Sequence, residues 1–180
     1  YNLGLALKYQ GRYNEAYDRF YKACWNAAWQ DAGYFACAQI STMQNRLADA
    51  LDEINHSLIR NWHNHKARAL KVAILRRMGQ SEEALQLIED SLAIDKFNFG
   101  CRYEKYLITN VSDELATLKE MMRGEPHNYD EIALDYCAAG CWQEAASLWN
   151  IAITEGAVTP MTYYYLGWCL VQGELPGTGQ

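Results

Sequence analysis

A repeat of 34 residues is the feature that most constrains how this chain can fold. Ala16, Ala50 and Ala84 are separated by that interval, and each directly follows an acidic residue. Bulky apolar residues recur four positions after each alanine: Phe20, Ile54 and Ile88. Self-similarity at a period between 20 and 50 residues is typical of stacked repeat proteins, in which each unit buries its apolar face against its neighbours.

Each unit is expected to consist of two amphipathic helices joined by a tight turn. Residues that tolerate a positive φ stand at one position of the period: Gly11, Asn45 and Gly79. Small residues recur where two helix axes approach and large ones where a gap must be filled. The pattern predicts an all-α fold, a right-handed superhelix or α-solenoid of helix-turn-helix repeats.

The predicted array runs over residues 1–172. Its expected units are 1–30, 31–64, 65–98, an irregular unit 99–125, then 126–159 and a single helix in 160–172. Residues 173–180 are expected to form a loop or tail. Because the chain starts at Tyr1 without a leader, we expect it to be a segment of a longer array.

The repeated residues resemble the tetratricopeptide repeat (TPR) family. The pattern is carried by Tyr1-Asn2-Leu3-Gly4, Leu7, Ala16, Phe20 and Ala23, and again by Tyr163, Leu166, Gly167 and Leu170. The closing proline of the family pattern is replaced in the first three units by Ala28, Trp62 and Lys96. The resemblance implies a scaffold that binds a protein or peptide in its concave groove, but the matching residues are packing residues.

A narrower resemblance concerns large bacterial proteins that carry an N-terminal domain of unknown function (family 5107) before a TPR array. It is carried by the runs Tyr13–Asn26, Asn64–Lys71 and Pro126–Tyr136. This resemblance implies that the chain is an accessory module, with any catalysis or carbohydrate-related activity in the missing part. The module would then pack against another domain of the same polypeptide.

Composition excludes several classes of partner. Sixteen basic and 22 acidic residues give a net charge of −6, which argues against a nucleic-acid binder that relies on bulk positive charge. No apolar run approaches the roughly 18 residues needed to cross a membrane. The six cysteines lie in apolar helical patterns, which favours buried free thiols over disulfides. Free thiols in turn indicate a cytoplasmic location.

Residues with catalytic or metal-binding chemistry are sparse. His56, His63 and His65 cluster around one inter-repeat loop and could hold a metal with Asp52 or Glu53, or simply form a polar loop. Cys137 and Cys141 lie about one helical turn apart without a second cysteine pair. We therefore expect no enzyme activity and no cofactor, and keep a metal-binding or catalytic role of the three histidines as an alternative.

Projecting the repeat onto a superhelix assigns a set of residues to the concave groove. They are Tyr1, Lys8, Tyr9, Phe35, Gln39, Lys66, Arg76 and Arg77. The same register places Phe20, Tyr136, Trp142 and Trp149 at packing positions. One hypothesis is a cationic, aromatic-lined groove for an acidic peptide; the alternative is that Arg76 and Arg77 are solvated cations near a helix end.

The carboxylate-binding site of co-chaperone TPR proteins can be compared position by position. Its cationic and amide positions correspond to Tyr1, Leu5, Ala36, Lys66 and Leu70, of which only Lys66 agrees. We therefore expect a scaffold whose ligand is recognised in another way.

Overall fold

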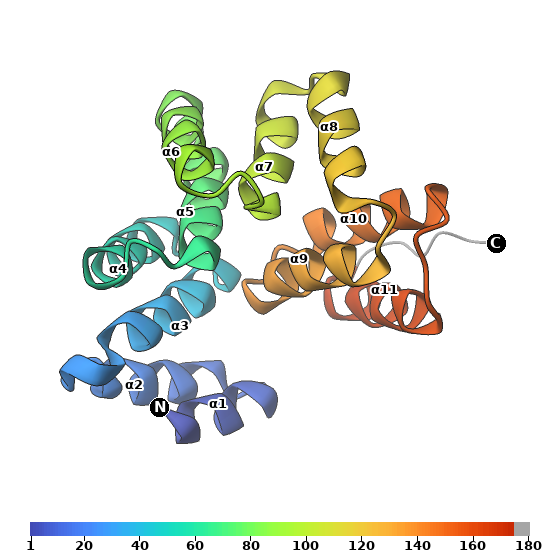
Figure 1. The fold of residues 1–180 in the computed structure, drawn as a ribbon. Helices are drawn as coiled ribbons and strands as arrows, with labels where there is room; N and C mark the ends of the chain where they lie inside the picture. The colour runs from blue at the N-terminus through green and yellow to red at the C-terminus, as the bar shows by residue number, and fades with distance from the viewer. Residues whose placement is uncertain (175–180) are drawn as a thin grey trace.

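The computed structural model describes residues 1–174 as a succession of α-helices (Figure 1). They are α1 (Asn2–Tyr9), α2 (Tyr13–Ala23), α3 (Gln30–Met43), α4 (Leu47–Arg60), α5 (His65–Arg77), α6 (Ser81–Ile94), α7 (Phe99–Thr109), α8 (Ser112–Met122), α9 (Pro126–Ala138), α10 (Trp142–Thr154) and α11 (Pro160–Gln172), with a short 3₁₀ turn at Ala27–Trp29. None of these helices is long and apolar enough to cross a membrane. The expected tail lies outside the described residues from position 175 onward.

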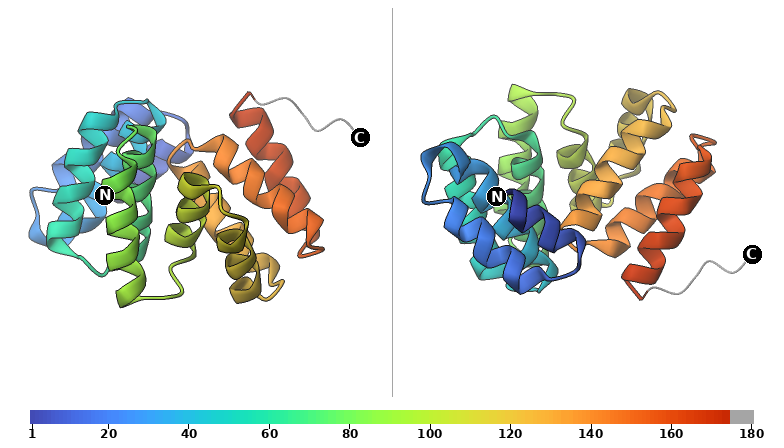
Figure 2. Two further views of the ribbon diagram at one scale, coloured as in Figure 1. Left: turned by 90° about the horizontal axis from the view of Figure 1, so that it is seen from above. Right: turned by 90° about the horizontal axis from the view of Figure 1, so that it is seen from below.

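Successive helices pack as antiparallel pairs, and the pairs follow one another in an arc (Figures 1 and 2). The turns within the pairs use the left-handed backbone that the repeat predicts. Positive φ angles of 73°, 57°, 76° and 71° occur at the equivalent positions Gly11, Asn45, Gly79 and Gly140. The all-α superhelix expected from the sequence is confirmed.

Small residues allow the helices of a pair to approach closely. A β-carbon added to Gly4 on α1 would lie 2.7 Å from the ring of Phe20 on α2, closer than side chains tolerate. Phe20 itself is fully buried, so its ring fills the space that the glycine leaves. This explains why the period repeats small and large residues at fixed offsets.

The fourth helix pair departs from this pattern. α7 and α8 have 11 residues each, and Asn110 ends α7 in a left-handed conformation with φ of 53°. α8 and α9 are not among the closely packed helix pairs of the described chain. Large buried side chains, namely Tyr103, Met122 and Tyr129, fill the wider space at this joint.

The shorter fourth pair brings the end of α9 against the inner side of the array. Gly140, directly after α9, lies against Met43 at the end of α3, where an added β-carbon would be 2.6 Å from Met43 Cγ. Because Gly140 also has a positive φ, this contact depends on glycine twice. The views in Figure 2 show α9 and the helices that follow it closing the arc.

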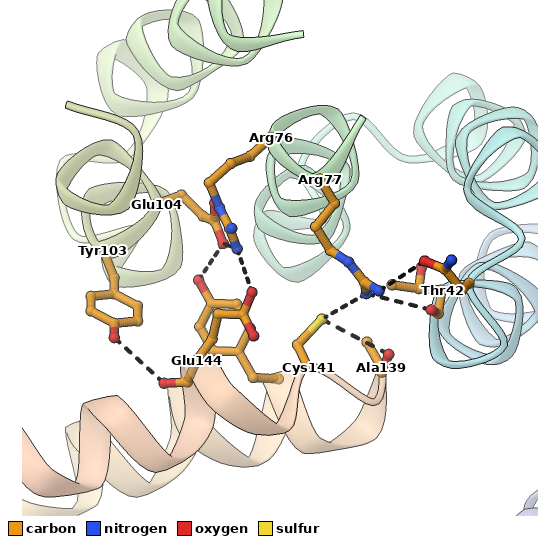
Figure 3. A network of polar contacts seen from close by, with 10 residues as sticks. Thr42, Arg76, Arg77, Tyr103, Glu104, Ala139, Cys141 and Glu144 are labelled. Atoms are coloured by element: carbon orange, nitrogen blue, oxygen red, sulfur yellow. Dashed lines mark hydrogen bonds and ion pairs between the residues drawn. The ribbon is translucent and has the colours of Figure 1, made fainter. Parts of the chain in front are cut away.

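A buried polar network holds this arrangement (Figure 3). Arg76 on α5 donates through Nε to Glu104 Oε2 on α7 at 2.7 Å and through its terminal nitrogen to Glu144 Oε1 on α10 at 2.7 Å. Tyr136 on α9 donates its hydroxyl to Glu104 Oε1 at 2.7 Å. One guanidinium thus connects four helices from three successive pairs.

The protonation of this network follows from its burial. Burial raises the pKa of Glu104, against the opposing effect of the Arg76 guanidinium. Burial disfavours the charge of Arg76, but the hydrogen bonds and charges of Glu104 and Glu144 outweigh it and raise the pKa of Arg76. The arginine therefore remains charged, and its removal would leave Glu104 buried without a counter-ion.

All six cysteines are free and buried, as the sequence predicts. Burial raises the pKa of every one of these thiols, to about 11 for Cys24 and about 12 for Cys101 and Cys141. The folded chain therefore holds its thiol protons more tightly than the unfolded chain, in which a thiol loses its proton near pH 8.5.

Removing the arginine of the network should destabilise the fold strongly. Because Glu104 would keep only Tyr136 as a partner, we expect Arg76→Met to lower the free energy of unfolding by about 3–5 kcal/mol. The exposed pair Arg12–Glu15 provides the control, and Arg12→Met should cost far less, because exposed ion pairs contribute little to stability. Urea denaturation followed by circular dichroism measures both, and equal losses would contradict the role of the network.

Alkaline pH should destabilise the protein through its thiols. When folding raises the pKa of a thiol, the stabilisation that results is complete below the pKa of that thiol in the unfolded chain. This stabilisation is lost as the pH rises from about 9 towards the thiol pKa values of the folded chain. The expected loss is about 1.4 kcal/mol per thiol and pH unit in that window. Urea titrations at pH 8, 9 and 10 under reducing conditions test this, and Cys101→Ala should show a shallower decline than the unaltered chain.

Candidate binding pocket on the inner face

The inner face of the array contains a pocket where four helices converge. α3, α5 and α9 each contribute one side, and residues 97–100 at the start of α7 close the fourth. The empty space between its walls, including open solvent at the mouth, is about 680 Å³. We call it the inner-face pocket.

Apolar side chains form most of its wall. Phe35 comes from α3, Leu70 from α5 and Ile132 from α9, while Phe97 lies in the α6–α7 connection and Phe99 is the first residue of α7. Phe97 is 55% exposed, although a phenylalanine gains by burial, and its ring meets Phe99 edge-on at 6.2 Å between centroids. The pocket therefore offers accessible aromatic surface at its mouth.

A set of charged residues joins the start of α5 to the middle and second half of α9. Lys66 Nζ is 3.0 Å from Asp135 Oδ1 and 3.2 Å from Glu131 Oε1. Burial raises the pKa of Asp135, opposed by Lys66, while the carboxylates outweigh burial and raise the pKa of Lys66. The predicted groove cation Lys66 is thus neutralised by carboxylates from α9.

Lys8 has a different environment at the C-terminal end of α1. Its Nζ donates to Gln39 Oε1 on α3 at 2.7 Å, and Gln39 lines the pocket. Burial lowers the pKa of Lys8 to about 8. No carboxylate of the described residues pairs with this ammonium group.

The two arginines assigned to the groove are used within the fold. Arg76 belongs to the buried network with Glu104 and Glu144. Arg77 donates to the Thr42 carbonyl at 3.4 Å and to Asn45 Oδ1 at 3.2 Å (Figure 3). The geometry therefore places both side chains at contacts between helices rather than at the pocket wall.

The two tyrosines assigned to the groove lie away from the pocket. Tyr1 stacks on Trp29 with 4.9 Å between ring centroids and packs against Phe20. Tyr9 is 89% exposed at the end of α1. Of the eight predicted residues, the structure brings Phe35, Gln39 and Lys66 together in the pocket and places Lys8 beside them.

The histidine cluster does not converge. The exposed His56 stacks on Tyr34 at 4.9 Å and lies 3.6 Å from Asp52. Within residues 1–174, no group of three or more histidine, cysteine or acidic side chains is arranged to hold a metal ion. The Cys141 sulfur accepts a hydrogen bond from the Arg77 guanidinium at 3.5 Å.

Sequence reasoning missed Phe97, Glu131 and Asp135. Phe97 lies in a connection between repeats, to which the helix register assigns no face. Glu131 and Asp135 lie in the middle and the second half of α9, and they contact Lys66 across a distance of more than 60 residues in the chain, which the repeat register does not describe. An exposed phenylalanine between two polar residues, Lys96 and Asn98, was the one available signal.

Comparison with known proteins identifies the fold. No protein-family model matches the chain, and no curated protein matches its sequence. Several solved structures resemble it at low sequence identity, and three of them are compared below.

The TPR protein from Parabacteroides merdae has a TM-score of 0.59 and 20% identity, covering 94% of this chain and 69% of that chain. TTC0263 from Thermus thermophilus, a thermophilic TPR protein, has a TM-score of 0.57 and 16% identity, with 94% and 96% covered. YrrB, described as a TPR protein with an unusual peptide-binding site, has a TM-score of 0.57 and 13% identity, with 91% and 88% covered. The chain thus has the fold of tetratricopeptide-repeat proteins.

Proposed function

We propose that this chain is a non-catalytic scaffold that binds a segment of a partner protein in the inner-face pocket. The observation that carries the proposal is the exposed aromatic wall around Phe97, set in a concave site of about 680 Å³. Concave, mostly apolar sites with a few polar groups are typical binding sites. The fold supports the same role, since repeat superhelices offer their inner face to ligands.

The pocket has the shape needed to anchor one large side chain. Phe35, Phe99 and Leu70 surround it, while Gln39 and Lys66 supply polar groups near its edge. Buried aromatic anchors contribute most of the affinity in many protein interfaces. YrrB is described as binding a peptide, which makes a peptide segment the first ligand class to test here.

A second candidate role is that of an accessory module packed against another domain of the same polypeptide. The observation that favours it is the uncovered side of α11, where Met161, Tyr163, Tyr164 and Val171 are between 45% and 74% exposed. Apolar patches of this kind often mark contact surfaces. Charged substitutions at Tyr164 and Val171 in a polypeptide that contains both domains would loosen such packing and speed limited proteolysis between the domains. An unchanged rate of proteolysis would contradict the accessory-module role.

Replacing Phe97 should weaken binding without unfolding the protein. The probe is the capped tripeptide acetyl-Gln-Phe-Gln-amide, and chemical shifts of Ala69 and Ala73 report on its entry. We expect Phe97→Ser to weaken probe binding about tenfold, because an aromatic contact at a hot spot contributes about 1–2 kcal/mol.

Ile94 provides the matched control. It is 47% exposed, precedes the same connection and does not line the pocket. Ile94→Ser should therefore bind the probe within about twofold of the unaltered chain, as expected for a surface substitution away from the site. Equal affinities of Phe97→Ser and the unaltered chain would show that the pocket is not the binding site.

A further inference from the structure

The cations of the inner face fall into two groups. Lys66 and Arg76 are ion-paired with carboxylates of later helices. Lys8 and Arg77 instead donate to uncharged groups, to Gln39 and to Thr42 and Asn45 respectively. Of the second group, only Lys8 reaches a residue that lines the inner-face pocket, since its partner Gln39 is part of the wall.

Lys8 is costly to the fold as it stands. An ammonium group that is partly removed from water, with one amide oxygen as its partner, loses hydration that a single hydrogen bond does not fully restore. The lowered pKa of about 8 expresses this cost. A lysine has three donor hydrogens, so Lys8 retains capacity for a further acceptor.

The carboxylates of the pocket pair with a different lysine. Lys8 lies in the last turn of α1, and its partner Gln39 lies in the second half of α3. The carboxylates Glu131 and Asp135 lie in the middle and the second half of α9, where both pair with Lys66. A negatively charged group beside Lys8 would therefore meet a cation that has no counter-ion among the described residues.

We infer that the segment bound in the inner-face pocket carries a carboxylate next to its apolar anchor and that this carboxylate pairs with Lys8. The inference rests on the proposed function, because it specifies the ligand of the same pocket. It differs from the TPR carboxylate site compared above, whose positions fall on Tyr1, Leu5, Ala36, Lys66 and Leu70. Here a single lysine from α1, presented through Gln39, recognises the acid.

The pairing has a defined pH dependence. Only Gln39 is hydrogen-bonded to Lys8 in the described chain, and burial is the sole cause of its lowered pKa, without a contribution from a charged group of α1, α2 or α3. A ligand carboxylate favours the protonated amine and so raises the pKa of Lys8. The preference for an acidic ligand is therefore complete below pH 8 and declines as the pH rises above it.

Three capped tripeptides test the inference by isothermal titration or NMR. Acetyl-Glu-Phe-Gln-amide and acetyl-Gln-Phe-Glu-amide carry one carboxylate on either side of the anchor, and acetyl-Gln-Phe-Gln-amide carries none. At pH 7 we expect at least one acidic probe to bind about fivefold more tightly than the neutral probe, as for a partly buried charge pair. At pH 9 that preference should fall below about twofold.

Two variants assign the effect to Lys8. Lys8→Met should remove the preference while leaving the affinity of the neutral probe unchanged, and Lys8→Arg should keep the preference at pH 7 and retain it at pH 9. Equal binding of all three probes to the unaltered chain would overturn the carboxylate inference and leave the pocket as a binding site. Absence of binding by every probe would overturn both proposals.

Discussion

The shape of this protein depends on one partly buried guanidinium. Arg76 on α5 reaches Glu104 on α7 and Glu144 on α10, and Tyr136 on α9 completes the coordination of Glu104. Glu104 is fully buried, so its charge requires these partners. The network therefore fixes the angle between the third helix pair and the two pairs that follow it. The same helices, α5, α7 and α9, provide walls of the inner-face pocket, so the network and the pocket share their framework.

The regular part of the fold could be predicted because its determinants are local and repeated. Gly11, Asn45 and Gly79 stand at one position of the period, and their positive φ angles follow from that position. Phe20, Tyr136 and Trp149 were assigned to the core from the same register and are buried. Each of these assignments depends on side chains within one unit or its neighbour, which a sequence period describes directly.

The site could be predicted only in part, because its remaining contacts join distant units. Phe35, Gln39 and Lys66, which the register predicts for the inner side, line the same pocket. Arg76 was assigned to the same surface, but its charge is used by residues 28 and 68 positions further along the chain. The irregular fourth pair, α7 and α8, interrupts the 34-residue period. The period therefore does not predict where the next helix, α9, lies relative to α3 and α5.

The ion pairs of Arg76 and Lys66 and the lack of a carboxylate partner at Lys8 share a physical cause. A cation on the inner face of an acidic superhelix either finds a carboxylate from a later unit or remains without one. Arg76 and Lys66 form ion pairs with Glu104 and Asp135, and these pairs connect helices of different units. Lys8, on the first helix, lies beyond the reach of α9 and α10 and pairs only with Gln39. The curvature of the array thus pairs the cations of its middle units with carboxylates and leaves Lys8 on the first helix without a carboxylate partner, close to the apolar pocket. A ligand with both an apolar and an acidic group can complement this combination.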